Sequence, residues 1–210
     1  MFSLDPFYPI LPDTEWLARL LPQGIRLVQL RIKDQPQNVV SAEVAKAVAL
    51  CRTHRCELVV NDYWQEAIAQ RASFVHLGQE DLARADVPAI KSAGIRLGVS
   101  THSDTELKAA LAANPDYVAL GPIYATTLKA MPWTPQGLLR LAEWRAKIDC
   151  RLVAIGGISL DRAPLALAAG ADSVAVITDI MTAEDPERRV GNWIAATAQW
   201  RNLSTGTAQA

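Results

Sequence analysis

Polar residues that could do chemistry follow short apolar segments along this chain. Asp62 and Asp81 come after two successive segments of this kind. If both segments are parallel strands, the carboxylates lie on neighbouring loops at one end of the sheet. Two carboxylates suit Mg²⁺, which keeps water ligands and binds phosphate oxygens of a substrate. The alternative is that each Asp caps the helix after it, and residue type alone favours that interpretation.

Basic side chains stand at comparable positions. Arg31 and Lys33 alternate with apolar residues at the end of another segment, and Lys129 follows a loop that opens with Gly121 and Pro122. Residues two apart on a strand share a face, so Arg31 and Lys33 should point together. Each taken alone is an ordinary surface cation, but cations that converge beside a bound Mg²⁺ would suit a diphosphate.

A second anion site is indicated further along the chain. Gly156 and Gly157 follow an apolar segment, and Thr178 follows the next one. At these places barrel enzymes often hold a phosphate with backbone N–H groups, although a glycine pair also serves tight turns. Two anion sites of different kinds predict two phosphorylated substrates.

The remaining reactive side chains give weaker signals. His76 lies within an apolar segment and His102 nearer a loop, and no Ser-His-Asp or Cys-His nucleophile is evident. Cys51, His54 and Cys56 are close in sequence, but no second ligand pair stands at zinc spacing, and Cys51 falls on the apolar side of a predicted helix. We therefore expect neither covalent catalysis nor a zinc site.

The elements that must position these groups alternate along the chain. Strand-like runs occupy 8–11, 27–30, 58–60, 74–77, 96–99, 117–120, 152–155 and 173–177. Apolar residues recur at helical spacing in 16–21, 39–52, 66–70, 87–93, 106–113, 136–146, 162–169 and 188–200. The strand-like runs are continuously apolar, as expected for parallel strands covered by helices. Eight such units predict an α/β fold, a single (β/α)8 TIM barrel. Barrels of this kind more usually have about 250 residues, so the loops of this one must be short. An open sheet of six or seven strands is the alternative.

Local signals agree with these boundaries. Ser103 with Glu106 forms a capping-box pattern, and Asp185 before Pro186 is a typical helix start. Glycines after predicted helices suit left-handed C-terminal caps, at Gly24, Gly94 and Gly170.

Composition limits the class of protein. With 210 residues, half of them hydrophobic and a fifth charged, we expect one catalytic domain over 1–200 and a flexible polar tail over 201–210. A net charge of −1 argues against a nucleic-acid partner.

Three cysteines fit a reducing compartment. No apolar run approaches the roughly 20 residues that span a bilayer, and no signal peptide is evident, so we expect a cytoplasmic protein without a membrane partner. The oligomeric state is left open.

Seven motifs, in order from Tyr8 to Ile180, resemble the thiamine-phosphate synthase family. They are QLRIKD (29–34), NDYW (61–64), VHLGQEDL (75–82), LGVSTH (97–102), YVALGPIYATTLK (117–129), VAIGGIS (153–159) and GADSVAVITDI (170–180). The resemblance implies a barrel enzyme that joins 4-amino-2-methyl-5-pyrimidinylmethyl diphosphate to 4-methyl-5-(2-phosphoethyl)thiazole. The products would be thiamine monophosphate and diphosphate.

The resemblance also implies a role for each matching residue. Asp62 and Asp81 would bind Mg²⁺, which reverses the preference for capping. The pyrimidine diphosphate would be held by Gln29, Arg31, Lys33, Asn61, Ser100, Thr126 and Lys129. His76 and Tyr117 would line the pyrimidine pocket, and Gly157, Ile177 and Thr178 would bind the thiazole phosphate. The catalytic groups would be Arg31, Lys33, Ser100 and Lys129, in a dry site for which the 121–137 loop is a candidate lid.

Three positions depart from the family pattern. Leu128 stands where a second hydroxyl is usual, with Thr127 as a possible substitute, Ser173 replaces a glycine, and Asp179 replaces an alanine beside the expected thiazole-phosphate site. We expect the Asp179 side chain to turn away from that phosphate, because neighbouring residues on a strand point to opposite faces. A related thiazole tautomerase and a non-catalytic sensor of a thiamine precursor are the alternative functions.

Overall fold

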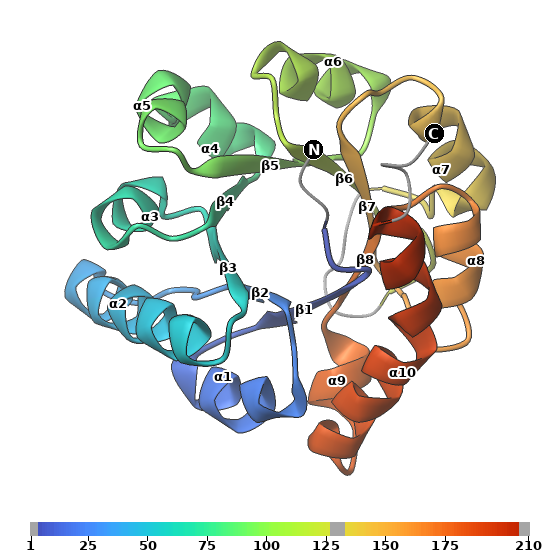
Figure 1. The fold of residues 1–210 in the computed structure, drawn as a ribbon. Helices are drawn as coiled ribbons and strands as arrows, with labels where there is room; N and C mark the ends of the chain where they lie inside the picture. Colours follow the sequence, from blue (N-terminus) through green and yellow to red (C-terminus); the bar gives the residue numbers. More distant parts are fainter. Residues whose placement is uncertain (1–3, 127–132, 206–210) are drawn as a thin grey trace.

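The computed structural model describes residues 4–126 and 133–205, with side chains described as far as Arg201. Within these ranges eight parallel strands form a closed barrel, each paired with the next in sequence, and β1 pairs with β8 (Figure 1). The strands are β1 (Phe7–Leu11), β2 (Leu27–Leu30), β3 (Glu57–Asn61), β4 (Phe74–Leu77), β5 (Arg96–Thr101), β6 (Tyr117–Leu120), β7 (Arg151–Ile155) and β8 (Ser173–Val176). The predicted (β/α)8 barrel is confirmed, and the open-sheet alternative is wrong.

Helices surround the barrel (Figure 1). Those predicted from the sequence are α1 (Thr14–Leu20), α2 (Gln37–Thr53), α3 (Trp64–Gln70), α5 (Val87–Ser92), α6 (Asp104–Ala112), α7 (Gly137–Arg145), α8 (Ala163–Ala168) and α10 (Pro186–Thr205). Three short elements were not predicted: η1 (Leu21–Gln23), α4 (Gln79–Arg84) and α9 (Thr178–Met181). Elements η1 and α9 are too short for a helical apolar period to repeat, and α4 buries none of its residues. In the described part of the chain, no helix is long and apolar enough to cross a membrane.

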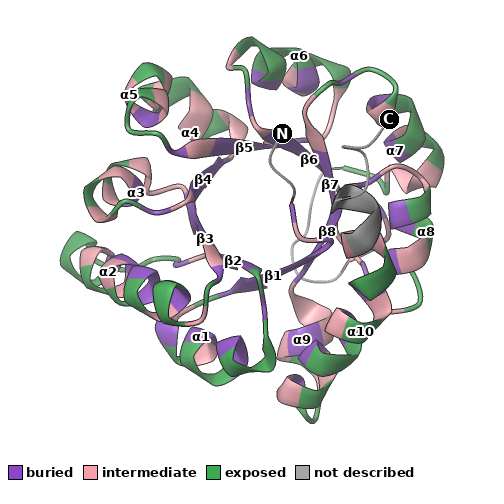
Figure 2. Cartoon of the chain, viewed as in Figure 1, coloured by how far each residue is buried: buried purple, intermediate pink, exposed green. Residues whose placement is uncertain are grey.

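Two apolar layers are separated by the strands. Along β2, Leu27 packs inside the barrel, whereas Val28 and Leu30 pack outward beneath the helices. Gln29 has the inward parity and contacts Tyr8, a member of the inner layer. Figure 2 shows the buried strands as a continuous ring and the exposed residues on the outer faces of the helices. Alternation along each strand therefore decides which side chains reach the barrel axis.

The local signals are largely confirmed. Asp185 accepts a hydrogen bond from the backbone N of Arg188 at 2.9 Å. Ser103 caps α6 through the N of Glu106, but the Glu106 carboxylate accepts from the N of His102, so the capping box is only half formed. The three helix-ending glycines have left-handed φ angles: 96° at Gly24, 74° at Gly94 and 106° at Gly170.

The segment before β1 and the C-terminal part of α10 meet at the N-terminal end of the barrel. Arg201 donates two hydrogen bonds to the Asp5 carboxylate, at 2.7 and 2.9 Å. The buried Ser173 donates to the Asp5 carbonyl oxygen at 2.7 Å, which gives this departure from glycine a structural role. Helix α10 continues to Thr205, beyond the predicted domain boundary at residue 200. The rest of the predicted tail, 206–210, lies outside the described residues.

Candidate active site

Residues predicted for the site come together at the C-terminal end of the barrel. Those on or directly after the ends of β2 to β5 are Gln29, Arg31, Lys33, Asn61, Asp62, His76, Asp81 and Ser100. Those on or after β6 to β8 are Tyr117, Thr126, Gly157, Ile177 and Thr178. Because parallel strands end on one face of a barrel, these groups converge there although they are distant in sequence. Lys129, together with Thr127 and Leu128, lies outside the described residues.

Asp62 and Asp81 face each other and cap no helix. The N-cap residues of α3 and α4 are Tyr63 and Gly78, and neither helix start receives a side-chain cap within the described chain. The two carboxyl groups lie within hydrogen-bonding reach of one another. Asn61 Nδ2 donates to Asp62 Oδ2 at 2.5 Å, which orients that carboxylate. The capping interpretation is therefore wrong for both residues.

Electrostatics at this pair favour a counter-ion. Burial, followed by the charge of Asp81, raises the pKa of Asp62 from 3.8 to about 6, and Arg31 opposes the rise. Two partly desolvated carboxylates in contact are unfavourable unless a proton or cation lies between them. Across the described ranges, no group of three or more His, Cys, Asp or Glu residues could hold a metal. Asp62 and Asp81 can thus contribute two ligands, with further ligands coming from water or a substrate.

The two cations after β2 differ in position. Arg31 is half-buried, its N donates to the Leu11 carbonyl oxygen at 2.8 Å, and its charge acts on both Asp62 and His76. Lys33 is exposed. The structure therefore brings Arg31 to the carboxylates, whereas the predicted role of Lys33 stays a prediction.

A row of hydrogen bonds crosses the barrel next to this pair. Gln29 Nε2 donates to Tyr8 Oη at 2.8 Å, and the Tyr8 and Tyr117 hydroxyls are 2.9 Å apart. Tyr117 Oη lies 2.9 Å from His76 Nδ1, and His76 Nε2 lies 2.7 Å from Ser100 Oγ. Burial lowers the pKa of His76 to about 4, with a further contribution from the charge of Arg31, and burial raises the pKa of both tyrosines. His76 is therefore neutral at pH 7.

Sequence reasoning missed Tyr8 in this row. Tyr8 lies on β1 and Tyr117 on β6, strands that are not neighbours in the sheet. The contact runs through the barrel interior, with the rings edge to face at 6.2 Å. The available signal was parity, because Tyr8 and Ile10 share the inward face of β1.

Gly98 makes room for the row. On the sheet it stands between His76 on β4 and Tyr117 on β6. A Cβ added at Gly98 would lie 2.0 Å from Tyr117 Cζ and 2.4 Å from its Oη. Real Cβ atoms do not approach so closely, so glycine lets the Tyr117 ring cross β5 and stack on His76 at 5.6 Å.

The glycine pair after β7 packs against the loop after β6. Gly156 and Gly157 have φ angles of 93° and 65°, and a Cβ at Gly157 would lie 2.5 Å from the Ala125 carbonyl oxygen. Arg162 donates to the Gly157 carbonyl oxygen at 2.7 Å and lies over the Tyr124 ring at 4.6 Å. Both glycines are thus required by left-handed backbone and close packing, whether or not they bind an anion.

Asp179 points away from the barrel mouth. Strand β8 ends at Val176 and Asp179 lies inside α9, so the strand alternation used for the prediction does not extend to this residue. Its carboxylate accepts hydrogen bonds from Arg189 at 2.6 and 2.8 Å and from Trp193 Nε1 at 2.7 Å, both on α10. The predicted direction is confirmed, although the cause is the ion pair with α10 rather than strand alternation.

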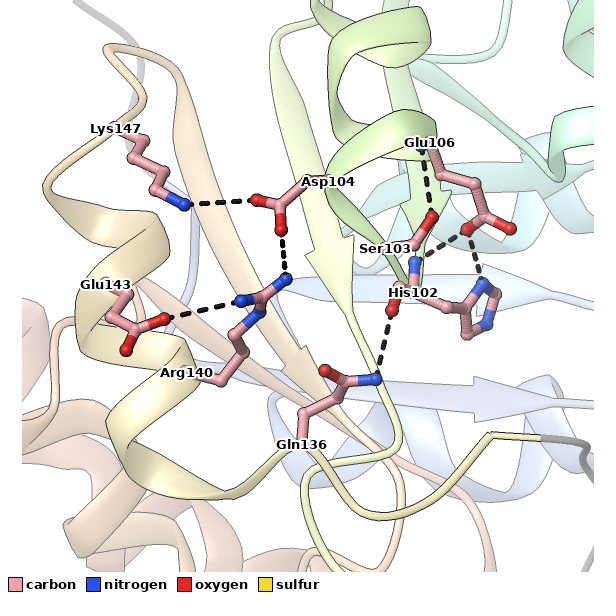
Figure 3. Close-up of polar contacts among 8 residues, drawn as sticks. All are labelled: His102, Ser103, Asp104, Glu106, Gln136, Arg140, Glu143 and Lys147. Carbon is pink, nitrogen blue, oxygen red and sulfur yellow. Dashed lines mark hydrogen bonds and ion pairs between the residues drawn. The ribbon is translucent and has the colours of Figure 1, made fainter.

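Residues that follow the undescribed segment 127–132 are held by α6 and the loop before it (Figure 3). Gln136 Nε2 donates to the His102 carbonyl oxygen at 3.0 Å, and the His102 ring stacks on Trp133 at 5.5 Å. Arg140 and Lys147 both bind Asp104 at the start of α6. These contacts anchor the C-terminal side of the 121–137 loop, and its predicted role as a lid stays a prediction.

Comparison with known proteins assigns the chain a family. Residues 9–180 match the family model described as thiamine monophosphate synthase. A thiamine-phosphate synthase of Rhizobium etli is 55% identical, covering 95% of this chain and 98% of that protein. A thiamine-phosphate synthase of Salmonella typhimurium is 50% identical, covering 94% and 93%. The solved structure of a thiamine phosphate pyrophosphorylase from Pyrococcus furiosus superposes with a TM-score of 0.82 at 27% identity, covering 93% and 96%. These relatives favour neither the tautomerase nor the sensor.

Proposed function

This chain belongs to the thiamine-phosphate synthase family of thiamine biosynthesis, and on that premise we propose its substrates and the roles of its site residues. It would join 4-amino-2-methyl-5-pyrimidinylmethyl diphosphate to 4-methyl-5-(2-phosphoethyl)thiazole, giving thiamine monophosphate and diphosphate. The observation that supports this most directly is the pair of facing carboxylates, Asp62 and Asp81, with the charge of Arg31 beside them.

Asp62 and Asp81 would hold Mg²⁺. The fit rests on their mutual contact, on the raised pKa of Asp62 and on the absence of a side-chain cap from either helix start in the described chain. When bound, Mg²⁺ would neutralise charge on the diphosphate of the substrate and complete its own coordination with phosphate oxygens and water.

The chain's own cations would act on the leaving group. As the bond from the pyrimidinylmethyl carbon to oxygen breaks, negative charge grows on the diphosphate and positive charge on the pyrimidinylmethyl group. Arg31, Lys33 and Lys129 would offset the growing negative charge, and Ser100 would donate a hydrogen bond to it. No protein nucleophile is needed, because the thiazole nitrogen attacks the electron-poor carbon.

Neutral groups would position the two substrates. Asn61, Thr126 and Gln29 would contact the pyrimidine diphosphate, and His76 and Tyr117 would line the pocket of its ring. The thiazole phosphate would lie against the backbone N–H groups near Gly157, Ile177 and Thr178. Holding the nitrogen close to the carbon favours attack by thiazole over attack by water.

Turnover with both phosphorylated substrates and Mg²⁺ tests the proposal, with thiamine monophosphate and diphosphate measured together. We expect Asp62→Asn and Asp81→Asn each to lose most of this turnover. Asp86→Asn is a matched control, because Asp86 does cap a helix, with its Oδ1 2.9 Å from the Ala89 N, and Asn keeps that function. Wild-type turnover and Mg²⁺ dependence in the Asp62 and Asp81 variants would refute the metal assignment.

A further inference from the structure

The row from Gln29 to Ser100 has a direction. Each tyrosine hydroxyl has one hydrogen to give, and a neutral imidazole has one N–H and one acceptor nitrogen. Tyr8, Tyr117 and His76 each take part in two links of the row, and both tyrosines are buried. A tyrosine that accepted in both of its links would leave its own hydrogen buried without a partner in the row, which is costly, so the direction of one hydrogen bond decides the direction of the others.

Two arrangements satisfy every link and also use the hydrogen of each tyrosine hydroxyl. In the first, Gln29 Nε2 donates to Tyr8, Tyr8 to Tyr117, Tyr117 to His76 Nδ1, and His76 Nε2–H to Ser100 Oγ. In the second, Gln29 is flipped and its Oε1 accepts from Tyr8, so every hydrogen bond reverses and Ser100 donates to His76. The first agrees with the 2.8 Å contact from Gln29 Nε2 to Tyr8 Oη.

The two ends of the row offer different groups to a ligand in each arrangement. In the first, Gln29 keeps Oε1 as an acceptor, and the Ser100 hydroxyl keeps its hydrogen to donate. In the second, Gln29 presents N–H groups, and the Ser100 hydrogen is already used by His76. The substrate of the proposed function carries an amino group, which donates, and a diphosphate, whose oxygens only accept. The first arrangement complements both groups, and the second complements neither.

We propose that the row runs from Gln29 to Ser100, with Tyr8 as a positioning residue that holds the Gln29 amide and Tyr117 as the residue that holds His76 in its Nε2–H tautomer. The inference rests on the proposed function, because it takes the substrate's diphosphate to lie at Ser100 and its amino group at Gln29. Gly98 is required for the row, since a side chain there would displace the Tyr117 hydroxyl from His76.

The direction is read from nitrogen chemical shifts of the histidine rings in the substrate-free protein at neutral pH. The chain has three histidines, and loss of one set of signals in His76→Asn assigns those of His76. We expect a pyrrole-type shift for Nε2 and a pyridine-type shift for Nδ1. The opposite pattern, or two pyrrole-type nitrogens, would overturn the proposal. This readout needs no substrate, so it tests the direction of the row even if the proposed reaction fails. A failure of this inference is therefore distinguishable from a failure of the proposed function.

Tyr→Phe variants separate the two tyrosines. Tyr117→Phe removes the donor to Nδ1, so the Nδ1–H tautomer should appear and kcat should fall about tenfold, with a smaller change in KM. Tyr8→Phe releases the Gln29 amide, so KM for the pyrimidine diphosphate should rise about fivefold while the His76 tautomer stays as in the unmodified protein.

Tyr63→Phe is the matched control, because Tyr63 packs on the outer core beside α3 rather than in the row. It should leave the tautomer, kcat and KM unchanged. The proposal fails if Tyr117→Phe keeps the tautomer and kcat, or if Tyr8→Phe affects the enzyme no more than Tyr63→Phe does.

Discussion

Asp62 occupies a position that is unfavourable for its own charge. It is half-buried in contact with Asp81, and its pKa is raised to about 6 although Arg31 and Asn61 oppose the rise. Such sites are common where a protein binds a cation or carries out chemistry, because function rather than stability decides the residue. The carboxylate therefore lowers the stability of the metal-free protein.

The pH dependence of this effect can be tested with Asp62→Asn. A folded-state pKa above the ordinary value of 3.8 favours the protonated form, so the stability that Asp62 contributes is full below about pH 4 and is lost as the pH rises through about 6. In EDTA, Asp62→Asn should therefore raise Tm at about pH 8 and change it little at about pH 4. Thermal melts across this range, with Asp86→Asn as control, measure the difference. A Tm shift that is independent of pH would contradict the assigned cause.

Ser173 shows a different kind of residue effect. Its buried hydroxyl binds the Asp5 carbonyl oxygen at the start of β8, whereas Thr178 follows the other end of this strand. Ser173→Gly should lower the free energy of unfolding by about 1–2 kcal/mol, through the lost hydrogen bond and the added backbone freedom. Urea unfolding measures this cost, and kcat should be unchanged. A loss of turnover without a loss of stability would show that Ser173 has a catalytic role instead.

At the scale of elements, Asp179 joins α9 to α10. Its carboxylate receives hydrogen bonds from Arg189 and Trp193, and the Trp193 ring in turn stacks on Phe7 of β1 at 5.4 Å. The start of the short helix α9, where the thiazole phosphate is proposed to bind, is thus held by a longer helix that is anchored on the barrel.

Asp179→Ala should therefore reduce stability more than substrate binding. Arg189 and Trp193 would lose their acceptor, which costs about 1–3 kcal/mol in unfolding free energy. The KM for the thiazole phosphate should change by less than about threefold, because the carboxylate does not face that site. Asp179→Asn retains an acceptor for Trp193, so its loss of unfolding free energy should be smaller than that of Asp179→Ala. A large fall in KM for the thiazole phosphate in Asp179→Ala would show that the carboxylate competes with the phosphate.

The order of elements could be predicted because the apolar period repeats from unit to unit and glycines follow three of the predicted helices. The short helices α4 and α9 could not, since α4 buries none of its residues and the four residues of α9 give no second turn of the pattern. This miss affected the site: Asp81 lies in the first turn of α4, and the helix after β8 changed the surroundings of Asp179. Residue type alone likewise favoured capping at Asp62, and only the three-dimensional contact with Asp81 excluded it.

Contacts through the barrel interior were also beyond sequence reasoning. Tyr8 and Tyr117 are 109 residues apart and lie on strands that are not paired, so neither spacing nor register connects them. The family motifs identified His76, Ser100 and Tyr117 individually. Their hydrogen-bonded order, and the need for Gly98 between them, emerged from the closed barrel alone.

At the scale of the whole molecule, the C-terminal and N-terminal ends of the barrel carry different kinds of residue. The C-terminal end gathers Asp62, Asp81 and the row that ends at Ser100. The N-terminal end is closed by aspartates that precede strands and accept from backbone N–H groups: Asp5 from Phe7, Asp116 from Leu97 and Asp172 from Leu152. In barrels of this kind, residues at the N-terminal end typically serve stability and those at the C-terminal end serve catalysis.

Arg201→Met tests this division. Arg201 and Asp5 form an ion pair in which the side chains are 14% and 7% exposed, so removing the guanidinium leaves a buried carboxylate without its main partner. Losing one member of a buried pair typically costs about 3 kcal/mol or more, so Arg201→Met should lower the free energy of unfolding by about that amount. The double variant Asp5→Asn with Arg201→Met leaves no isolated charge and should recover part of the loss.

Both variants should keep the kcat and KM of the unmodified protein when assayed well below their Tm, because the pair lies at the end opposite Asp62 and Asp81. Urea unfolding and steady-state kinetics on the same samples decide the matter: a kcat that falls while the protein remains folded would mean that the two ends are coupled through the barrel.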